Sequence, residues 1–240
     1  MADRGILFSA PMVRGLLAKT KTQTRRAIKP QPPEGARYTG IHYASYEPDS
    51  HFFNSPSGPF KVRQRIEEGD RLWVREAWAT TAAYDDLKPS EMGGEEPIRY
   101  DADGHHQTWG YPAIAKIGRK RPGMFMPRWA SRLTLIVTEV RVQRLQEISE
   151  ADASAEGIEL VRKTDQWGSH WRNYGADGFD DRSAVYSYRT LWNSLHGHMG
   201  KALLAVEPWQ ANPWVAAYTF TVHKQNIDAA ALPVPAQGRG

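Results

Sequence analysis

Residues 130–148, ASRLTLIVTEVRVQRLQEI, decide the fold class because they carry the clearest β-strand pattern of the chain. Apolar side chains recur at every second position in two runs, at Leu133, Leu135 and Val137 and then at Val140 and Val142. Such alternation is typical of a strand that buries one face. The shift between the two runs predicts a bend or bulge near Thr138 and Glu139.

On either side of this strand, the sequence alternates between strand patterns and helix patterns. Strands are predicted over residues 22–28, 71–78 and 212–224, and helices over residues 9–20, 149–157 and 180–197. Ser9 and Ser149 are the expected N-caps of the first two helices, and Gly157 is expected to end the second. Residues 30–60 and 80–128 lack periodicity and are interpreted as long loops. The pattern therefore predicts an α+β protein, a mixed β-barrel with flanking helices at its mouth.

The composition sets the function classes that fit. The chain has 240 residues, of which 40% are hydrophobic and 24% charged, as in ordinary ordered proteins of one large domain. It has no cysteine, which excludes disulfides, a thiolate nucleophile and cysteine-based zinc sites. No apolar run is long enough to span a membrane, so we expect a cytoplasmic protein with no membrane partner. A net charge of +4 is compatible with a nucleotide or nucleic-acid ligand.

Residues 16–30, LLAKTKTQTRRAIKP, place amines and hydroxyls close together after the first predicted helix. Two functional interpretations fit: a basic patch that binds phosphate, or a lysine positioned to deprotonate a threonine. A plainer one makes Lys21 a solvated cation at a helix C-terminus and Thr24 a strand former. The residues alone leave these alternatives open.

The order of the motifs LLAKTKTQTRR, GDRLWVREAW and VTEVRVQRLQEISEADASAEGI, followed by a last aromatic strand, resembles the ASCH domain family. The larger ASCH proteins of phages and prophages are the most similar. The resemblance covers most of residues 5–160 and the last strand, and implies a PUA-like barrel. It implies a single domain over residues 1–228, with insertions near 30–60, 80–128 and 161–182 and a flexible tail at 229–240.

Small bacterial ASCH proteins remove the acetyl group from N4-acetylcytidine, without a cofactor or metal, using a K-T-x-T motif and a glutamate. The resemblance implies that Lys21, Thr24 and Glu156 are the catalytic residues here. Thr24 would attack the acyl carbonyl, Lys21 would take its proton, and Glu156 would orient Lys21 or pass a proton to the leaving nitrogen. On a straight strand Lys21 and Thr24 point to opposite faces, so we expect Lys21 in the turn that closes the helix.

We expect four further residues to bind the substrate: Arg26, Trp73, Glu76 and Ser9. Arg26 would share a strand face with Thr24 and hold the substrate carbonyl. Trp73 would stack on a base, although core packing is the default for any tryptophan of this chain. Glu76 would hydrogen-bond a pyrimidine edge, or form a structural ion pair with Arg75 or Arg71.

Two classes of function therefore stand. The first is a metal-independent amidohydrolase whose partner is a small molecule, an N4-acylated cytosine, cytidine or related nucleoside. The second is an RNA-binding module or ribonuclease that uses the same cleft and the basic loop at 118–123. Modest charge and the lack of a Lys/Arg stripe favour the small substrate. The histidines show no metal-ligand spacing.

Overall fold

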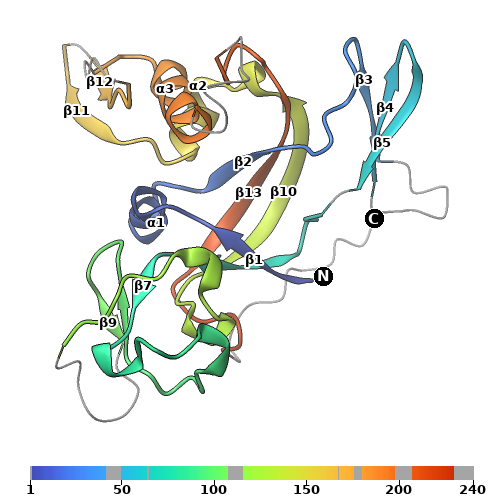
Figure 1. Ribbon diagram of the computed structural model, residues 1–240. Coiled ribbons are helices and arrows are strands. Elements are labelled where there is room, and N and C mark those ends of the chain that lie inside the picture. Colours follow the sequence, from blue (N-terminus) through green and yellow to red (C-terminus); the bar gives the residue numbers. More distant parts are fainter. Residues whose placement is uncertain are drawn as a thin grey trace. The chain divides into compact units, whose positions relative to one another are not determined.

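The computed structural model describes residues 2–41, 50–63, 65–107, 116–166, 168–175, 180–197 and 207–229. They form two compact units, each built from segments that are distant in sequence. The first unit comprises Met1–Lys19, Glu68–Thr138 and Phe220–Gly240, and the second comprises Thr20–Glu67 and Glu139–Thr219. The boundaries between the units in the sequence fall within two long strands, β10 (Thr134–Arg144) and β13 (Trp214–His223), which Figure 1 labels. The single domain over residues 1–228 stays a prediction.

Among its described residues, the first unit contains one α-helix and short strands. Its elements are β1 (Asp3–Leu7), α1 (Ala10–Leu17), β6 (Arg71–Arg75), β7 (Trp78–Ala79), β8 (Ile98–Tyr100) and β9 (His106–Gln107), with 3-10 turns at Ala82–Tyr84, Pro89–Glu91, Gly123–Phe125 and Arg128–Ala130. Strand β1 pairs in parallel with β6, and β6 pairs antiparallel with β10. Strands β7, β8 and β9 form a second, antiparallel sheet. The core beside that sheet includes Trp78, Ile98 and Tyr100.

Helix α1 begins where the sequence predicts and ends at Leu17, earlier than the predicted residue 20. Ser9 has the extended backbone of an N-cap, and Pro11 occupies the first turn, where a missing N–H costs nothing. The Ser9 side chain makes no capping hydrogen bond among the described residues, so only the position of the predicted cap is confirmed. Val13 and Leu16 bury the apolar face, and the chain turns away at Lys19, whose φ is 59°.

The second unit holds the remaining elements. They are β2 (Gln23–Ala27), β3 (Arg37–Ile41), β4 (Ser50–Ser55), β5 (Gly58–Arg63), the 3-10 turn Leu145–Glu147, α2 (Glu150–Ala155), β11 (Leu160–Thr164), β12 (Gly168–Trp171) and α3 (Ala184–His196). Strand β2 pairs antiparallel with β13, with Thr24 opposite Tyr218. Strands β3, β4 and β5 form an antiparallel sheet of their own, and β11 pairs with β12.

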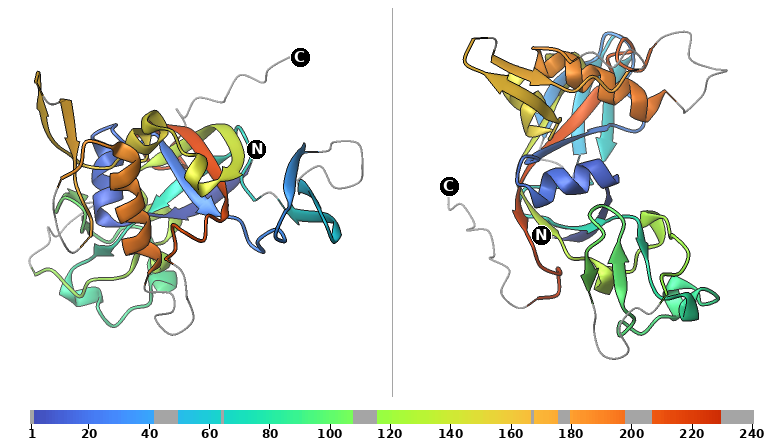
Figure 2. Two further views of the ribbon diagram at one scale, coloured as in Figure 1. Left: turned by 90° about the horizontal axis from the view of Figure 1, so that it is seen from above. Right: turned by 90° about the vertical axis from the view of Figure 1, so that its left-hand side faces the viewer.

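The two predicted C-terminal helices are confirmed. The Ser149 hydroxyl accepts a hydrogen bond of 3.1 Å from the Asp152 backbone N–H, and the chain leaves α2 through Gly157 at φ +78°. Helix α3 starts at Ala184 instead of 180 because the Ser183 hydroxyl caps it. The two helices lie side by side, as the views of Figure 2 show, over a shared apolar core.

Two fold predictions need correction. The described strands are distributed over four sheets and none of these closes into a barrel, so the structure supports the α+β class but not the barrel. Residues 30–60 are not one long loop, because β3, β4 and the start of β5 lie there. Phe53 and Val62 pack this sheet against Trp214, and a turn at Pro56 and Ser57 joins β4 to β5.

The other predicted insertions also contain regular structure. Strands β8 and β9 fall within 80–128, and β11 and β12 fall within 161–182. Residues 230–240 of the predicted tail lie outside the described residues. None of the helices in the described part of the chain is long and apolar enough to cross a membrane.

Candidate functional site

The candidate site of the second unit lies along the edge of β2. One side of β2 pairs with β13. Just before the strand begins, the Thr22 N–H donates a 2.9 Å hydrogen bond to the Ala155 carbonyl, and Lys21 forms a β-bridge with Glu156. The end of α2 therefore covers this edge, which would otherwise present unpaired backbone groups.

Gly157 permits this close approach. A Cβ at position 157 would lie 2.6 Å from the Lys21 Cβ and 3.2 Å from its Cα, distances at which atoms collide. Its φ of +78° is also one that side-chain-bearing residues rarely adopt. Glycine is thus required here both for backbone conformation and for space.

Lys21 holds a fully buried ammonium against this edge. Its Nζ donates to the Gln23 carbonyl at 2.8 Å, the Glu156 carbonyl at 2.7 Å and the Glu156 Oε2 at 3.1 Å. These three acceptors match the three donors of an ammonium group. Burial lowers the pKa of Lys21 below its ordinary value, against the opposing charge and hydrogen bond of Glu156. The site therefore favours a lysine that loses its proton more readily than one in water.

Thr24 is buried on β2, and the relation between it and Lys21 differs from the predicted one. Lys21 is not in the turn that closes α1, because that turn lies at Lys19. The Lys21 side chain runs along the chain to the carbonyl of Gln23, which belongs to the peptide group that ends at Thr24 N. Backbone carbonyls of a strand point along its edges and not out of its faces. The ammonium thus reaches the edge of β2 at the peptide group that precedes Thr24, without the predicted turn.

The Glu156 carboxylate belongs to a wider network of charges. Its Oε1 accepts from Arg25 Nη1 at 3.0 Å, while Arg25 Nη2 donates to Asp152 at 3.0 Å. Asp152 accepts a further 2.8 Å bond from Arg141. Although partial burial raises the pKa of Asp152, the hydrogen bond from Arg141 and the charge of Arg25 bring it down to about 2. Glu156 is therefore held by two cations, Lys21 and Arg25, and Asp152 in turn binds Arg25.

Sequence reasoning missed Arg25, Asp152 and Gln23 as partners in this network, yet a signal for them existed. Gln23 and Arg25 alternate along β2 and therefore point to one face, opposite to that of Thr24. Asp152 and Glu156 are four residues apart at the end of α2, so they too share a face. Arg25 makes this face of the strand cationic, and Asp152 and Glu156 make this face of the helix anionic. These opposite charges predict that the two faces pack against each other.

Arg26 lies on the Thr24 face of β2, as predicted. It pairs in register with Ala216 of β13 and, together with Tyr218, lines a pocket of about 230 Å³. Burial lowers its pKa, opposed by the charge of Glu156. Position and charge both leave Arg26 suited to bind an anion or a carbonyl oxygen.

The other predicted substrate-binding residues, Ser9, Trp73 and Glu76, belong to the first unit. Ser9 is exposed at the start of α1. Trp73 of β6 is half-buried, with the Arg75 guanidinium 5.3 Å from its ring centroid and the backbone of Gly5 packed against the ring. These contacts match the packing role that was the default for a tryptophan, and base stacking stays a prediction.

Glu76 forms an ion pair, but with neither of the arginines considered from the sequence. Its carboxylate accepts from Arg132 Nε at 2.9 Å and Nη2 at 3.0 Å. Arg132 also donates to both Asp103 oxygens and lies 4.0 Å from the centroid of the Tyr100 ring. Arg71 instead pairs with Asp3. Arg75 instead lies against the Trp73 ring, 5.3 Å from its centroid.

No group of three or more His, Asp or Glu side chains that could hold a metal ion occurs among the described residues. The chain matches no protein-family model, no curated protein and no solved structure. The resemblance to the ASCH family stays a prediction.

Proposed function

We propose that the protein is an amidohydrolase that removes the acyl group from N4-acylated cytosine or cytidine. The observation that carries the proposal is the buried Lys21 ammonium, with its lowered pKa, which is held by Glu156 and by the carbonyl of Gln23, the residue before Thr24. A general base works best when its pKa lies near the working pH, which an ordinary lysine does not satisfy. Burial supplies the shift in the required direction.

The proposed reaction has two steps. The Thr24 Oγ attacks the acyl carbonyl carbon while the neutral Lys21 amine takes the hydroxyl proton, and the C–N4 bond then breaks as that proton passes to the leaving N4. The products of this step are an acyl-threonine ester and the free cytosine amine. Water then attacks the ester with its proton taken by Lys21, and cleavage of the C–O bond returns that proton to the Thr24 Oγ and releases the carboxylic acid.

The neighbouring groups take supporting roles in this scheme. Glu156 holds the Lys21 ammonium that forms after proton transfer, so it is a positioning residue. Arg25 keeps the Glu156 carboxylate in place through a 3.0 Å hydrogen bond. Arg26, on the same face as Thr24, stabilises the negative oxygen that develops on the attacked carbonyl.

The test incubates the purified protein with N4-acetylcytidine and measures cytidine by chromatography, with and without EDTA. Turnover is expected in both conditions. Thr24→Ala and Lys21→Arg should each lower kcat at least about 100-fold, since a guanidinium cannot act as a base. Thr24→Ser should keep part of the activity because the hydroxyl remains.

Matched controls come from the same segment. Thr22→Ala and Lys19→Arg change exposed residues of the same types, and both should retain normal turnover. Near-normal kcat for Lys21→Arg would refute the assignment of Lys21 as the base. If EDTA abolished the activity and zinc restored it, the nucleophile would be a metal-bound water and not Thr24.

A second candidate function, RNA binding, is favoured by a different observation. Thr24 is only 2% exposed, whereas the pocket beside Arg26 is open and lined by cations. Binding to RNA through several phosphates would weaken steeply between about 50 and 200 mM salt, whereas hydrolysis of an uncharged nucleoside would change little.

A further inference from the structure

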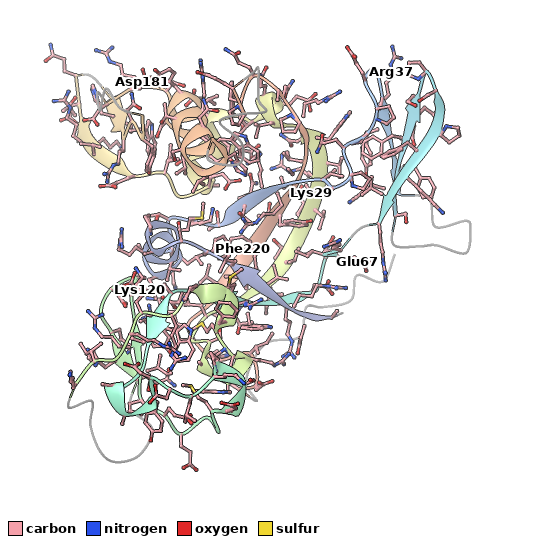
Figure 3. The ribbon with its side chains drawn as sticks, viewed as in Figure 1. Lys29, Arg37, Glu67, Lys120, Asp181 and Phe220 are labelled. Carbon is pink, nitrogen blue, oxygen red and sulfur yellow. The ribbon has the colours of Figure 1, made fainter. Side chains whose placement is uncertain are left out.

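A small pocket opens in the second unit where β2 ends. Its walls come from three places: the end of β2 and the residues after it, strand β13, and the segment from β4 to just beyond β5. That last segment falls within and just after the predicted insertion near 30–60, so part of the wall is chain beyond the ASCH-like motifs. Figure 3 labels Lys29, which follows β2 at this pocket.

The charged groups at the pocket all have one sign. Arg26, Lys29, Arg63 and Arg65 line it, and no carboxylate is among its described lining residues. The last three are exposed, and none of them has an ion-pair partner within the part of the chain that the structure describes. His51 also lines the pocket, and burial lowers its pKa to about 4, so it is neutral near pH 7. Four cations around one opening attract an anion.

Beneath the cations the pocket is apolar. Ile28, Val62, Ile66 and Ala216 form this part of the lining, with the ring of Tyr218 beside them. The volume of about 230 Å³ is smaller than the roughly 300–1,000 Å³ of pockets that enclose a whole ligand. It suits one charged group with a small uncharged neighbour, such as a phosphate and part of its sugar.

The pocket also lies next to Thr24. Arg26 is two residues along the strand, a distance of about 7 Å between Cα atoms. Tyr218 is the direct cross-strand partner of Thr24, and Arg26, Ala216 and Tyr218 share the face of the Thr24 side chain. A phosphate in the pocket would thus be about one nucleotide unit or less from the hydroxyl.

We propose that this pocket binds a phosphate group of a nucleotide, so that the substrate is a phosphorylated acylcytidine and not the free base or nucleoside. The nature of the reacting group rests on the proposed function, whereas phosphate binding by the four cations does not. Arginine suits the role because its planar donors match two phosphate oxygens at once. The phosphate comes from a mononucleotide or from an RNA backbone, and the two sources are separated by the test.

The test measures binding and turnover separately. Isothermal titration compares cytidine, CMP and a cytidine-containing RNA trinucleotide on the wild type, on Arg63→Ala/Arg65→Ala and on the control Arg37→Ala. Arg37 is an exposed arginine of β3 in the same small sheet, outside the pocket (Figure 3). Turnover is then compared for N4-acetylcytidine and its 5′-monophosphate. Circular dichroism checks that each variant is folded, and Arg63→Glu serves as a second variant.

CMP or the trinucleotide should bind at least about tenfold more tightly than cytidine, since charge-assisted hydrogen bonds are worth roughly that factor or more. The double variant should lose this advantage and Arg37→Ala should keep it. Preference for CMP identifies a mononucleotide, and preference for the trinucleotide identifies RNA. Equal affinity for cytidine, CMP and the trinucleotide, or an unchanged affinity advantage in the double variant, would overturn the proposal. Absence of turnover with intact phosphate binding would refute the proposed function alone.

Discussion

Replacing Glu156 with glutamine keeps the shape of the side chain and removes the negative charge opposite Lys21. Lys21 is fully buried, and its ammonium would keep the carbonyls of Gln23 and Glu156 but lose its 3.1 Å carboxylate partner. Arg25 would still have Asp152 at 3.0 Å. The cation that loses its carboxylate partner at position 156 without a second carboxylate among its hydrogen bonds described above is therefore Lys21.

Removing one partner of a buried ion pair costs about 3–5 kcal/mol of unfolding free energy. In a chain of this size each kcal/mol corresponds to about 2–4 °C, so Tm should fall by about 6–20 °C. The matched control is Glu159→Gln, three residues away, whose pair with Arg172 is more than half exposed on both sides. That change should cost no more than about 1 kcal/mol.

The loss should also depend on pH in a defined direction. The pKa of Lys21 is already below its ordinary value of 10.5, and removing Glu156 removes an interaction that raises it. When the folded-state pKa is the lower one, the unfolded chain binds more protons, so stability rises with pH between the two pKa values. The variant should therefore recover part of its deficit as the pH rises below the ordinary lysine pKa of 10.5.

Urea unfolding followed by circular dichroism measures both effects. If Glu156→Gln were no less stable than Glu159→Gln, the buried pair would not have the assigned role. A deficit that stayed constant with pH would show that Lys21 does not titrate as inferred from its burial.

Two further predictions concern the same network. Gly157→Ala should lower the unfolding free energy by about 1–3 kcal/mol more than Gly168→Ala. Both glycines have positive φ, but only a Cβ at position 157 would meet another residue, Lys21. Equal losses in urea unfolding would argue against a close approach of Gly157 to Lys21. Asp152 has a pKa of about 2, below its ordinary 3.8, so the stability it contributes is present above the ordinary value and lost as pH falls through about 2. Asp152→Asn should thus lose less stability than the wild type between about pH 4 and pH 2, and parallel acid-unfolding curves would contradict this.

Most of the local structure follows from neighbouring residues. The serine before α2 and the glycine after it determine where that helix begins and ends, because both act through hydrogen bonds or dihedral angles within one turn. The alternation around residues 134–144 likewise predicts β10 without knowledge of its partners. The β4–β5 hairpin is not predicted, even though the sequence Pro56-Ser57-Gly58 where its strands meet is typical of a turn, because aromatic and polar residues obscure the alternation in both strands.

In the candidate site, too, some features follow from the local sequence and others only from the tertiary structure. The sequence by itself predicts a lysine, a threonine and a glutamate in their motifs, and the covering of the β2 edge by the end of α2 brings Glu156 to Lys21 across 135 positions. The tertiary structure also pairs Glu76 with Arg132, although Arg71 and Arg75 are nearer to Glu76 in the sequence. Caps and strand alternation depend on bonds within a few residues, so the sequence determines them locally. Which buried charges neutralise each other depends on which segments pack together, and only the tertiary structure decides that.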